Sequence, residues 1–148
     1  MSPPREVRRL SKTAAAYIAG LVDGEGTVTL TRQHRNESRR LTLSISNTEI
    51  ALLEFVKDSV GAGRITGKRT YSQRHAPSFT YAITSRQALA VLEQILPYLR
   101  SYKRSRATLA LQHYVQLTPR NGRYTKKLMD ARSRFESRLL GIRVRPTA

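Results

Sequence analysis

The chain has 148 residues, and it contains no cysteine, no tryptophan and few acidic residues. The absence of cysteine excludes disulfide scaffolds, cysteine-ligated zinc sites and thiol nucleophiles. No apolar run approaches the roughly 20 residues of a membrane span, and the first residues lack the apolar stretch of a secretory signal. The sequence therefore predicts a soluble, intracellular protein with no targeting signal and no membrane partner. At this length a chain buries a real core without covalent staples.

The charge is strongly biased toward one sign. The chain has 27 Lys and Arg against 10 Asp and Glu, which gives a formal net charge of +17. Self-repulsion of this size opposes folding unless a polyanionic partner makes it useful. Between Asp58 and Asp130 the only carboxylate is that of Glu93. Nucleic acid is the leading partner, although a membrane surface or a ribosome would explain the same charge.

The spacing of apolar residues predicts a flexible basic arm at 1–10 and a single α+β domain over 11–148, whose last part, 118–148, is a basic helical extension. The expected order is α-β-β-α-β-β-α-α-α, without an internal repeat. Ser11 or Thr13 is expected to cap the first helix, and Ser85 the third. Helices are predicted near 14–23, 50–60, 86–96, 101–117 and 124–140. Strands are predicted near 27–33, 40–46, 64–71 and 78–84.

Both predicted hairpins have one apolar face and one polar face. This pattern predicts a four-stranded sheet that has helices on its apolar side and an open polar side. A two-stranded ribbon fits the major groove of B-DNA, so the polar side is a candidate DNA-reading surface. The expected DNA contacts lie on these strands and their loops: Thr29, Thr31, Arg32, Gln33, His34, Arg35, Arg40, Thr42, Ser44, Ser46, Arg64, Thr66, Lys68, Thr70, Arg74 and Thr80.

Two carboxylates, those of Asp23 and Glu25, stand at the C-terminal end of the first predicted helix. The helix dipole is negative there and destabilises each carboxylate by roughly a few tenths of a kcal/mol or more. A bound divalent cation would explain why both acids stand there, because Mg²⁺ takes oxygen ligands from one or two carboxylates plus substrate phosphates. Gly24 lies between the two acids and offers an unshielded main-chain carbonyl.

The same helix carries small residues at a spacing of four, which are Ala16, Gly20 and Gly24. Such a stripe lets two backbones approach closely. A second copy of this helix would pack on the stripe and bring two Glu25 side chains together. Alternatively, the small residues fit under the sheet of their own chain.

The run from Ile18 to Gly26, IAGLVDGEG, resembles the motif that names the LAGLIDADG homing endonucleases. The resemblance extends over about 14–117, including 41–47, 52–65 and 97–107. It implies an αββαββα fold with a four-stranded antiparallel DNA-binding sheet, and cleavage of both strands of double-stranded DNA with Mg²⁺ or Mn²⁺. Ca²⁺ is expected to support binding without cleavage. One copy of the motif implies a homodimer on a near-palindromic target.

Carried over residue by residue, the resemblance implies that Glu25 is the metal-binding acid and that the carbonyl of Gly24 belongs to the same metal site. Lys103 matches the basic catalytic lysine of the family, and Asn47 matches a polar residue that organises water. Asp23 matches the second acid of the motif, which is mainly structural. The resemblance places the dimer interface at Ala16, Gly20, Asp23 and Gly24.

Each of these roles has a simpler alternative. Glu25 can be an ordinary helix-end acid, Asn47 can be a helix cap, and Lys103 can bind a phosphate without taking part in chemistry. The arginines of the C-terminal extension are expected to form a solvated face that adds electrostatic attraction: Arg132, Arg134, Arg138, Arg143 and Arg145.

Two other functional classes stay open. One is a LAGLIDADG-type protein without cleavage, such as an intron maturase or a transcription regulator. The other is a basic structural protein, such as a ribosomal component, which would explain the charge but not the acids at the helix end. No motif for a small-molecule substrate is present in a matching context.

Overall fold

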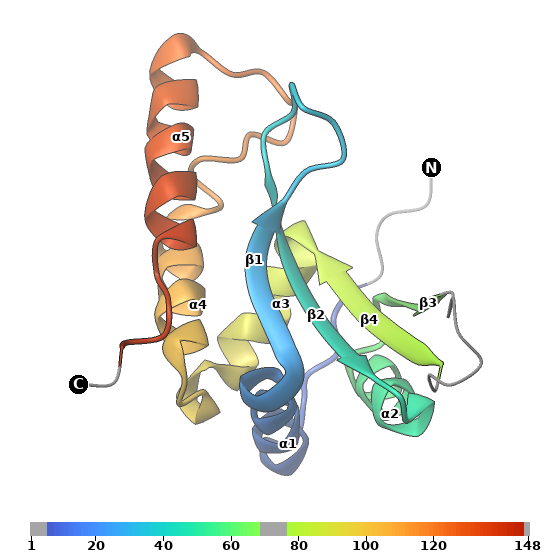
Figure 1. The fold of residues 1–148 in the computed structure, drawn as a ribbon. Coiled ribbons are helices and arrows are strands. Elements are labelled where there is room, and N and C mark those ends of the chain that lie inside the picture. Colours follow the sequence, from blue (N-terminus) through green and yellow to red (C-terminus); the bar gives the residue numbers. More distant parts are fainter. Residues whose placement is uncertain (1–5, 69–76, 147–148) are drawn as a thin grey trace.

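The order of helices and strands is αββαββα, followed by two further helices, and it confirms the predicted α+β fold (Figure 1). The computed structural model describes residues 6–68 and 77–146. The strands are β1 (Gly26–Thr31), β2 (Arg40–Asn47), β3 (Arg64–Lys68) and β4 (Ser78–Thr84). The helices are α1 (Lys12–Glu25), α2 (Ile50–Val60), α3 (Ser85–Ile95), the short 3-10 helix η1 (Leu96–Tyr98), α4 (Tyr102–His113) and α5 (Lys126–Leu140).

The four strands form one antiparallel sheet in the order β1-β2-β4-β3. Both predicted hairpins are present, and β2 and β4 join them at the centre of the sheet. Leu43 shows the register, because it pairs with Val28 on one side and with Ile83 on the other. Side chains alternate across a strand, so this register gathers the apolar residues of all strands on one face.

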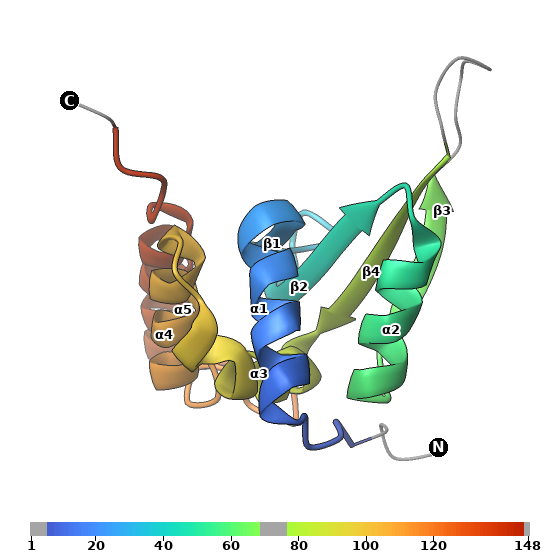
Figure 2. The ribbon, with the colours of Figure 1, turned by 90° about the horizontal axis from the view of Figure 1, so that it is seen from below.

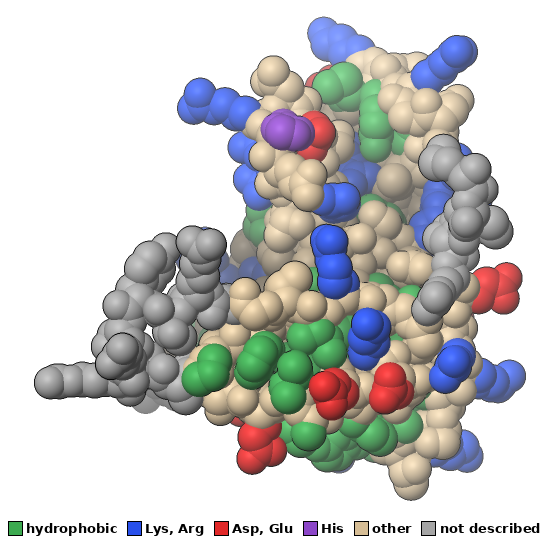
Figure 3. Space-filling model, turned by 90° about the vertical axis from the view of Figure 1, so that its right-hand side faces the viewer, with side chains coloured by type: hydrophobic (Ala, Val, Ile, Leu, Met, Phe, Trp, Pro, Cys, Tyr) green, Lys and Arg blue, Asp and Glu red, His purple; other side chains and the backbone are tan. Residues whose placement is uncertain are grey.

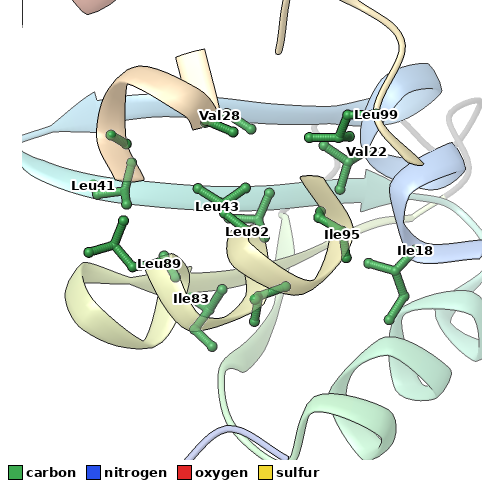
Figure 4. Close-up of a cluster of buried hydrophobic side chains, with 14 of the residues drawn as sticks. Ile18, Val22, Val28, Leu41, Leu43, Ile83, Leu89, Leu92, Ile95 and Leu99 are labelled. Carbon is green, nitrogen blue, oxygen red and sulfur yellow. The ribbon is translucent and has the colours of Figure 1, made fainter. Parts of the chain in front are cut away.

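Helices α1, α2 and α3 cover the apolar face of the sheet (Figure 2). Figure 4 shows the core between them, where Ile18 and Val22 of α1 lie near Leu43 of β2 and Leu92 and Ile95 of α3. All five side chains are at most 1% exposed. Full burial of a side chain of this size contributes about 1.5–3 kcal/mol, so this layer fixes where α1 ends relative to the sheet.

The turn between α2 and β3 depends on Gly63. Its φ is +100°, and a Cβ built on it would lie 2.5 Å from the ring of Tyr81. The Tyr81 hydroxyl donates a hydrogen bond to the carbonyl oxygen of Ala62 at 2.8 Å, and burial raises the pKa of this phenol. The aromatic ring of β4 thereby fixes the start of β3.

The helix starts agree only partly with prediction. Ser11 caps α1, because its Oγ accepts a hydrogen bond from the amide of Ala14 at 3.1 Å. The prediction that Ser85 caps α3 is wrong, because Thr84 occupies the cap position and makes no side-chain cap bond. Ser85 is the first helical residue and has a φ of +57°, a region that non-glycine residues rarely occupy.

Residues 6–10 of the predicted flexible arm are hydrogen-bonded to the domain. The amide of Arg8 donates to the carbonyl of Val60 at 2.8 Å, and the amide of Leu10 donates to Oε1 of Gln94 at 2.6 Å. Nε2 of Gln94 donates in return to the carbonyl of Arg8 at 3.1 Å. This part of the arm therefore lies across α2 and α3, while residues 1–5 are outside the described part of the chain.

Helix α5 packs beside α4 and the edge strand β1 (Figures 1 and 2). The prediction that Arg132 belongs to a solvated face is wrong, because this residue is only 2% exposed. Its guanidinium lies 4.9 Å from the ring centre of Tyr114 and pairs with Glu136 one turn further along α5. None of the described helices is both long and apolar enough to cross a bilayer.

Candidate functional site

Glu25 and Asn47 meet at the end of the sheet where α1 becomes β1. The amide group of Asn47, at the end of β2, donates a hydrogen bond to the carboxylate of Glu25. The Oδ1 atom of Asn47 also accepts from the amide of Glu49 at 2.8 Å, just before α2. Glu49 is the N-cap residue of α2, so the alternative that Asn47 is the helix cap is wrong. The Asn47 side chain instead joins Glu25 to the turn before α2.

Gly26 permits the abrupt change from helix to strand after Glu25. A Cβ at this position would lie 2.6 Å from the Cα atom of Val22 and 3.1 Å from the carbonyl oxygen of Ser44. Any larger residue would push β1 away from α1 or from β2. Glu25 is therefore held at a fixed place at the sheet end, with its side chain exposed.

The carboxylate of Asp23 lies at the N-terminus of α4. It accepts hydrogen bonds from the amide of Arg100 at 2.9 Å and from the amide of Ser101 at 3.1 Å, and a third from the Ser101 hydroxyl. Burial raises the pKa of this carboxyl, but these hydrogen bonds and the charge of Lys103 outweigh burial and leave it below its ordinary value. Asp23 thus has a partner within its own chain, and its position at the end of α1 needs no metal ion to explain it.

Lys103 makes the opposite contact from α4 to α1. Its ammonium donates to the carbonyl oxygens of Val22 at 2.8 Å and Asp23 at 2.9 Å, and the residue is 8% exposed. Burial lowers the pKa of this ammonium, and the nearby Asp23 carboxylate partly offsets the effect. Each helix end therefore receives the charge that its dipole favours, which stiffens the end of α1 just before Glu25.

The small residues of α1 face outward. Ala16, Gly20 and Gly24 are exposed, whereas Ile18 and Val22 of the same helix are buried. No described atom outside the helix lies within 4 Å of a Cβ built at Gly20 or Gly24. The alternative that these small residues fit under the sheet of their own chain is therefore wrong.

An exposed aromatic pair lies beside this stripe. Tyr17 of α1 and Phe55 of α2 are 45% and 43% exposed, and their rings meet edge to face at 5.2 Å. Figure 3, which views the molecule from the side of α2, shows hydrophobic side chains gathered beside acidic ones on the lower part of this face. The outer surface of α1 and α2 thus carries exposed aromatic side chains in this very basic chain.

The polar face of the sheet lies opposite helices α1, α2 and α3 (Figure 2). Arg40 and Arg64 are exposed on it. Two pairs of hydroxyls bond to each other at 2.7 Å. They are Thr31 with Thr42, and Ser46 with Thr80. By the register, the strand positions predicted to read DNA share this face: Thr29, Thr31, Arg40, Thr42, Ser44, Ser46, Arg64, Thr66, Lys68 and Thr80.

The family profile described as LAGLIDADG endonuclease matches residues 18–117. The chain belongs to this family. No curated protein sequence matches the chain at the significance required.

The fold is similar to solved structures of homing endonucleases. One is the homing endonuclease I-CvuI in complex with its target in the presence of Ca, with a TM-score of 0.73, 19% identity, and coverage of 92% of this chain and 85% of that one. Another is the archaeal intron-encoded I-Vdi141I complexed with DNA, at 0.59 and 13%, covering 91% and 87%. A third is the meganuclease I-AabMI bound to uncleaved DNA, at 0.64 and 20%, covering 90% and 46%. At these identities the likeness shows the fold.

The LAGLIDADG motif spans the second half of α1 and ends at the first residue of β1. Within the described residues no cluster of three or more acidic or histidine side chains could hold a metal by itself. One exposed carboxylate, Glu25, beside the open face of Gly24 nevertheless fits Mg²⁺, which keeps several waters and uses few protein ligands together with phosphates. A second copy of the chain would bring a second carboxylate.

Several predicted DNA contacts differ from expectation in this LAGLIDADG chain. Strand β1 ends at Thr31, so Arg32 and Gln33 belong to an exposed loop with His34 and Arg35. Thr42 is only 9% exposed. Nothing is described of the side chain of Lys68, and Thr70 and Arg74 lie outside the described residues. By the register, three further residues share the polar face, and they are Thr27, Ser78 and Thr84.

Proposed function

We propose that this LAGLIDADG protein is a DNA endonuclease that cuts both strands of a near-palindromic target as a homodimer and requires a divalent metal. The observation that carries the proposal is Glu25, an exposed acid fixed at the end of a helix whose outward face is open to a partner. The family and the DNA complexes of proteins with this fold support the same reading. The chain has a net charge of +17, which suits a phosphate backbone.

The proposed dimer forms through α1. Ala16, Gly20 and Gly24 would let two copies of this helix touch, and the Tyr17–Phe55 pair would add apolar area at the edge of the contact. A two-fold axis here brings the two Glu25 carboxylates together and sets two sheets side by side. Such a dimer matches a two-fold symmetric DNA target.

The proposed chemistry centres on Glu25. Its carboxylate and the carbonyl of Gly24 would hold Mg²⁺, which when bound activates water and stabilises the leaving oxygen. Asn47 orients the Glu25 carboxylate through the hydrogen bond between them. Lys103 of α4 binds the carbonyls at the end of α1, and we assign it a positioning role that acts through Glu25.

The proposed DNA-reading surface is the polar sheet face together with loop 32–39. Exposed arginines such as Arg40 and Arg64 can donate two hydrogen bonds to guanine in the major groove. The hydroxyls of the strands can donate or accept, and they suit either base edges or phosphates.

The test is a selection of bound duplexes from a randomised library in Ca²⁺, followed by cleavage of the selected duplexes in Mg²⁺ or in EDTA. We expect a near-palindromic sequence to be enriched and cut on both strands in Mg²⁺ only. Enrichment without cleavage would instead favour the non-cleaving binding protein. No enrichment at all would favour a structural role for the charge.

The dimer has its own test in Gly20→Leu. Because the added side chain points to open space, the fold should persist. The dimer dissociation constant should rise by about fivefold to 150-fold, as about 1–3 kcal/mol of overpacking implies. Sedimentation measures the change, and Gly20→Ala is the mild control. A Gly20→Leu variant that still dimerises and cuts would place the interface elsewhere.

A further inference from the structure

A buried arginine of α5 holds the loop between β1 and β2. Arg132 donates from Nη2 to the carbonyl oxygen of Arg39, the last residue of that loop. Its Nη1 donates to the carbonyl of Leu117 at 2.9 Å and to the hydroxyl of Thr118. The ring of Tyr114 lies against the guanidinium, with 4.9 Å to the ring centre. The loop, the end of α4 and α5 therefore meet at one side chain.

Glu136 doubles this link. Its two carboxylate oxygens pair with Nε of Arg132 at 3.4 Å and with Nε of Arg39 at 3.5 Å. Both the backbone and the side chain of Arg39 are thus bound to α5. Glu136 is only 15% exposed, so water screens these pairs less than pairs on an open surface.

The far end of α5 is fixed to the sheet by another buried arginine. Arg106 of α4 donates to the carbonyl of Val28 in β1 at 2.9 Å, and to the carbonyls of Leu140 at 3.3 Å and Ile142 at 2.9 Å. Helix α5 therefore lies along β1 and is held at both ends, by Arg106 at its C-terminus and by Arg132 near the loop (Figure 1). It lies beyond residue 117, where the match to the family profile ends.

We propose that α5 is a positioning element for DNA recognition, in which Arg132, acting through Arg39, sets the orientation of loop residues 32–35. This proposal rests on the function proposed above, because these exposed loop residues are assigned to DNA reading there. A loop held in its bound conformation loses less freedom on binding, and its side chains meet defined base pairs. Without the link, the same side chains would still attract phosphates but would no longer select bases.

The test compares Arg132→Lys with Phe135→Leu. The lysine keeps the positive charge beside Glu136, but its single ammonium nitrogen cannot stand at both guanidinium positions, one of which donates to Arg39 and the other to Leu117 and Thr118. Phe135 is buried on the same helix, and its ring centre lies 6.4 Å from that of His113 of α4, so its variant is a matched control for weakened α5 packing. Glu136→Gln, which keeps the shape and removes both ion pairs, serves as the second variant if Arg132→Lys does not fold.

Hydrogen exchange on the DNA-free protein gives the first readout. We expect the backbone amides of residues 33–39 to exchange about tenfold faster in Arg132→Lys than in the parent, with β2 and α1 unchanged. In Phe135→Leu the loop should exchange like the parent loop relative to β2. Equal loop exchange in Arg132→Lys and Phe135→Leu would overturn the proposal.

The base preference of selected duplexes gives the second readout. Loop variants such as Arg35→Ala identify the base pairs that the loop reads, and Arg64→Ala identifies base pairs that the sheet reads. In Arg132→Lys we expect base preference to fall about tenfold at the first set and to stay unchanged at the second. A uniform loss at all positions would overturn the positioning role. If the parent selects no duplex, the proposed function fails, and the exchange experiment still decides whether Arg132 orders the loop.

Discussion

The β1–β2 hairpin is held by two different devices at its two ends. At the Glu25 end, α1 and α4 exchange charges, so Asp23 binds the amides of α4 and Lys103 binds the carbonyls of α1. At the loop end, α5 provides Arg132, which binds the carbonyl of Arg39. The first device joins helix ends next to the sheet core, and the second joins a surface loop to a helix at the edge.

In the proposed function, the Glu25 end of the hairpin carries the chemistry and the loop end carries the recognition of DNA. A hydrolytic site needs its acid fixed, and Glu25 follows a helix end that two reciprocal contacts stiffen. A reading loop needs a defined shape but also the freedom to change with the target, and its support comes from two side chains of α5, Arg132 and Glu136. If the loop and Glu25 have the proposed roles, changes in the loop or at Arg132 would alter target preference without moving Glu25.

The largest effect is expected from Glu25→Gln, which should change the cleavage rate and leave DNA binding nearly intact. We expect cleavage to fall by about a thousandfold or more, because a metal contact worth several kcal/mol is lost. DNA binding in Ca²⁺ should stay within about tenfold, since little contact area changes. Single-turnover cleavage and a binding titration measure the two quantities. Glu54→Gln on the exposed side of α2 is the control, and a fully active Glu25→Gln would refute the metal assignment.

Lys103→Met probes the support beneath the same site. We expect the single-turnover rate at saturating protein to fall by about a hundredfold, because the carbonyls before Glu25 lose the cation that holds them and Glu25 loses its exact position. Affinity should change far less, because this ammonium is buried and bound within the protein. The control is exposed Arg104→Met one residue further along α4. If the loss of affinity accounts for the whole defect, Lys103 contacts the phosphate backbone of DNA instead.

The sequence predicted the repetitive parts of this molecule well and the long-range polar contacts poorly. Leu43, Tyr81 and their neighbours alternate with hydroxyls, and period two is enough to give the strands and their faces. The partner of Asp23 lies 77 residues away, and no local pattern indicates that distance. Arg132 is likewise buried by groups that only the fold brings together, so its charge alone suggested a solvated side chain.

Within the candidate site, the motif predicted the acid but not its surroundings. Glu25 was identified by resemblance, and Asn47 proved to contact it directly. Lys103 was also identified by resemblance, and its side chain binds two carbonyls of α1, a contact that the sequence did not indicate. The C-terminal end of a helix is negative and attracts a positive charge, so the ammonium of Lys103 binds these carbonyls instead of solvent.

A smaller effect is expected at the reading end from Arg40→Ala. Arg40 begins β2, directly after the residue that α5 holds, and it is exposed on the polar face. If it contacts guanine with two hydrogen bonds, its loss should relax preference at one or two base pairs per half-site by about 1–3 kcal/mol. Arg134→Ala, exposed on α5, should weaken binding about equally on all sequences. Identical selection profiles for Arg40→Ala and the parent would show that this strand does not read bases.

The smallest effect, and the one that needs no DNA, concerns Asp23. Asp23→Asn should lower the free energy of unfolding near neutral pH by about 1–2 kcal/mol, because the hydrogen bonds from Arg100 and Ser101 lose their charged acceptor. Burial raises the pKa of Asp23, but the hydrogen bonds from Ser101 and Arg100 outweigh it, so the folded pKa lies below the ordinary 3.8. The contribution is therefore complete above pH 4 and is lost as pH falls through the folded pKa.

Urea unfolding of parent and Asp23→Asn between pH 7 and pH 2 measures this contribution directly. The two stability curves should run parallel at neutral pH and converge below about pH 4, where the parent carboxylate takes up its proton. Exposed Asp130→Asn on α5 is the control and should follow the parent throughout. A gap between parent and Asp23→Asn that persists unchanged to pH 2 would mean that the geometry of this side chain, rather than its charge, joins α1 to α4. The Glu25 end of the hairpin would then depend on shape, as the loop end depends on the fork of Arg132.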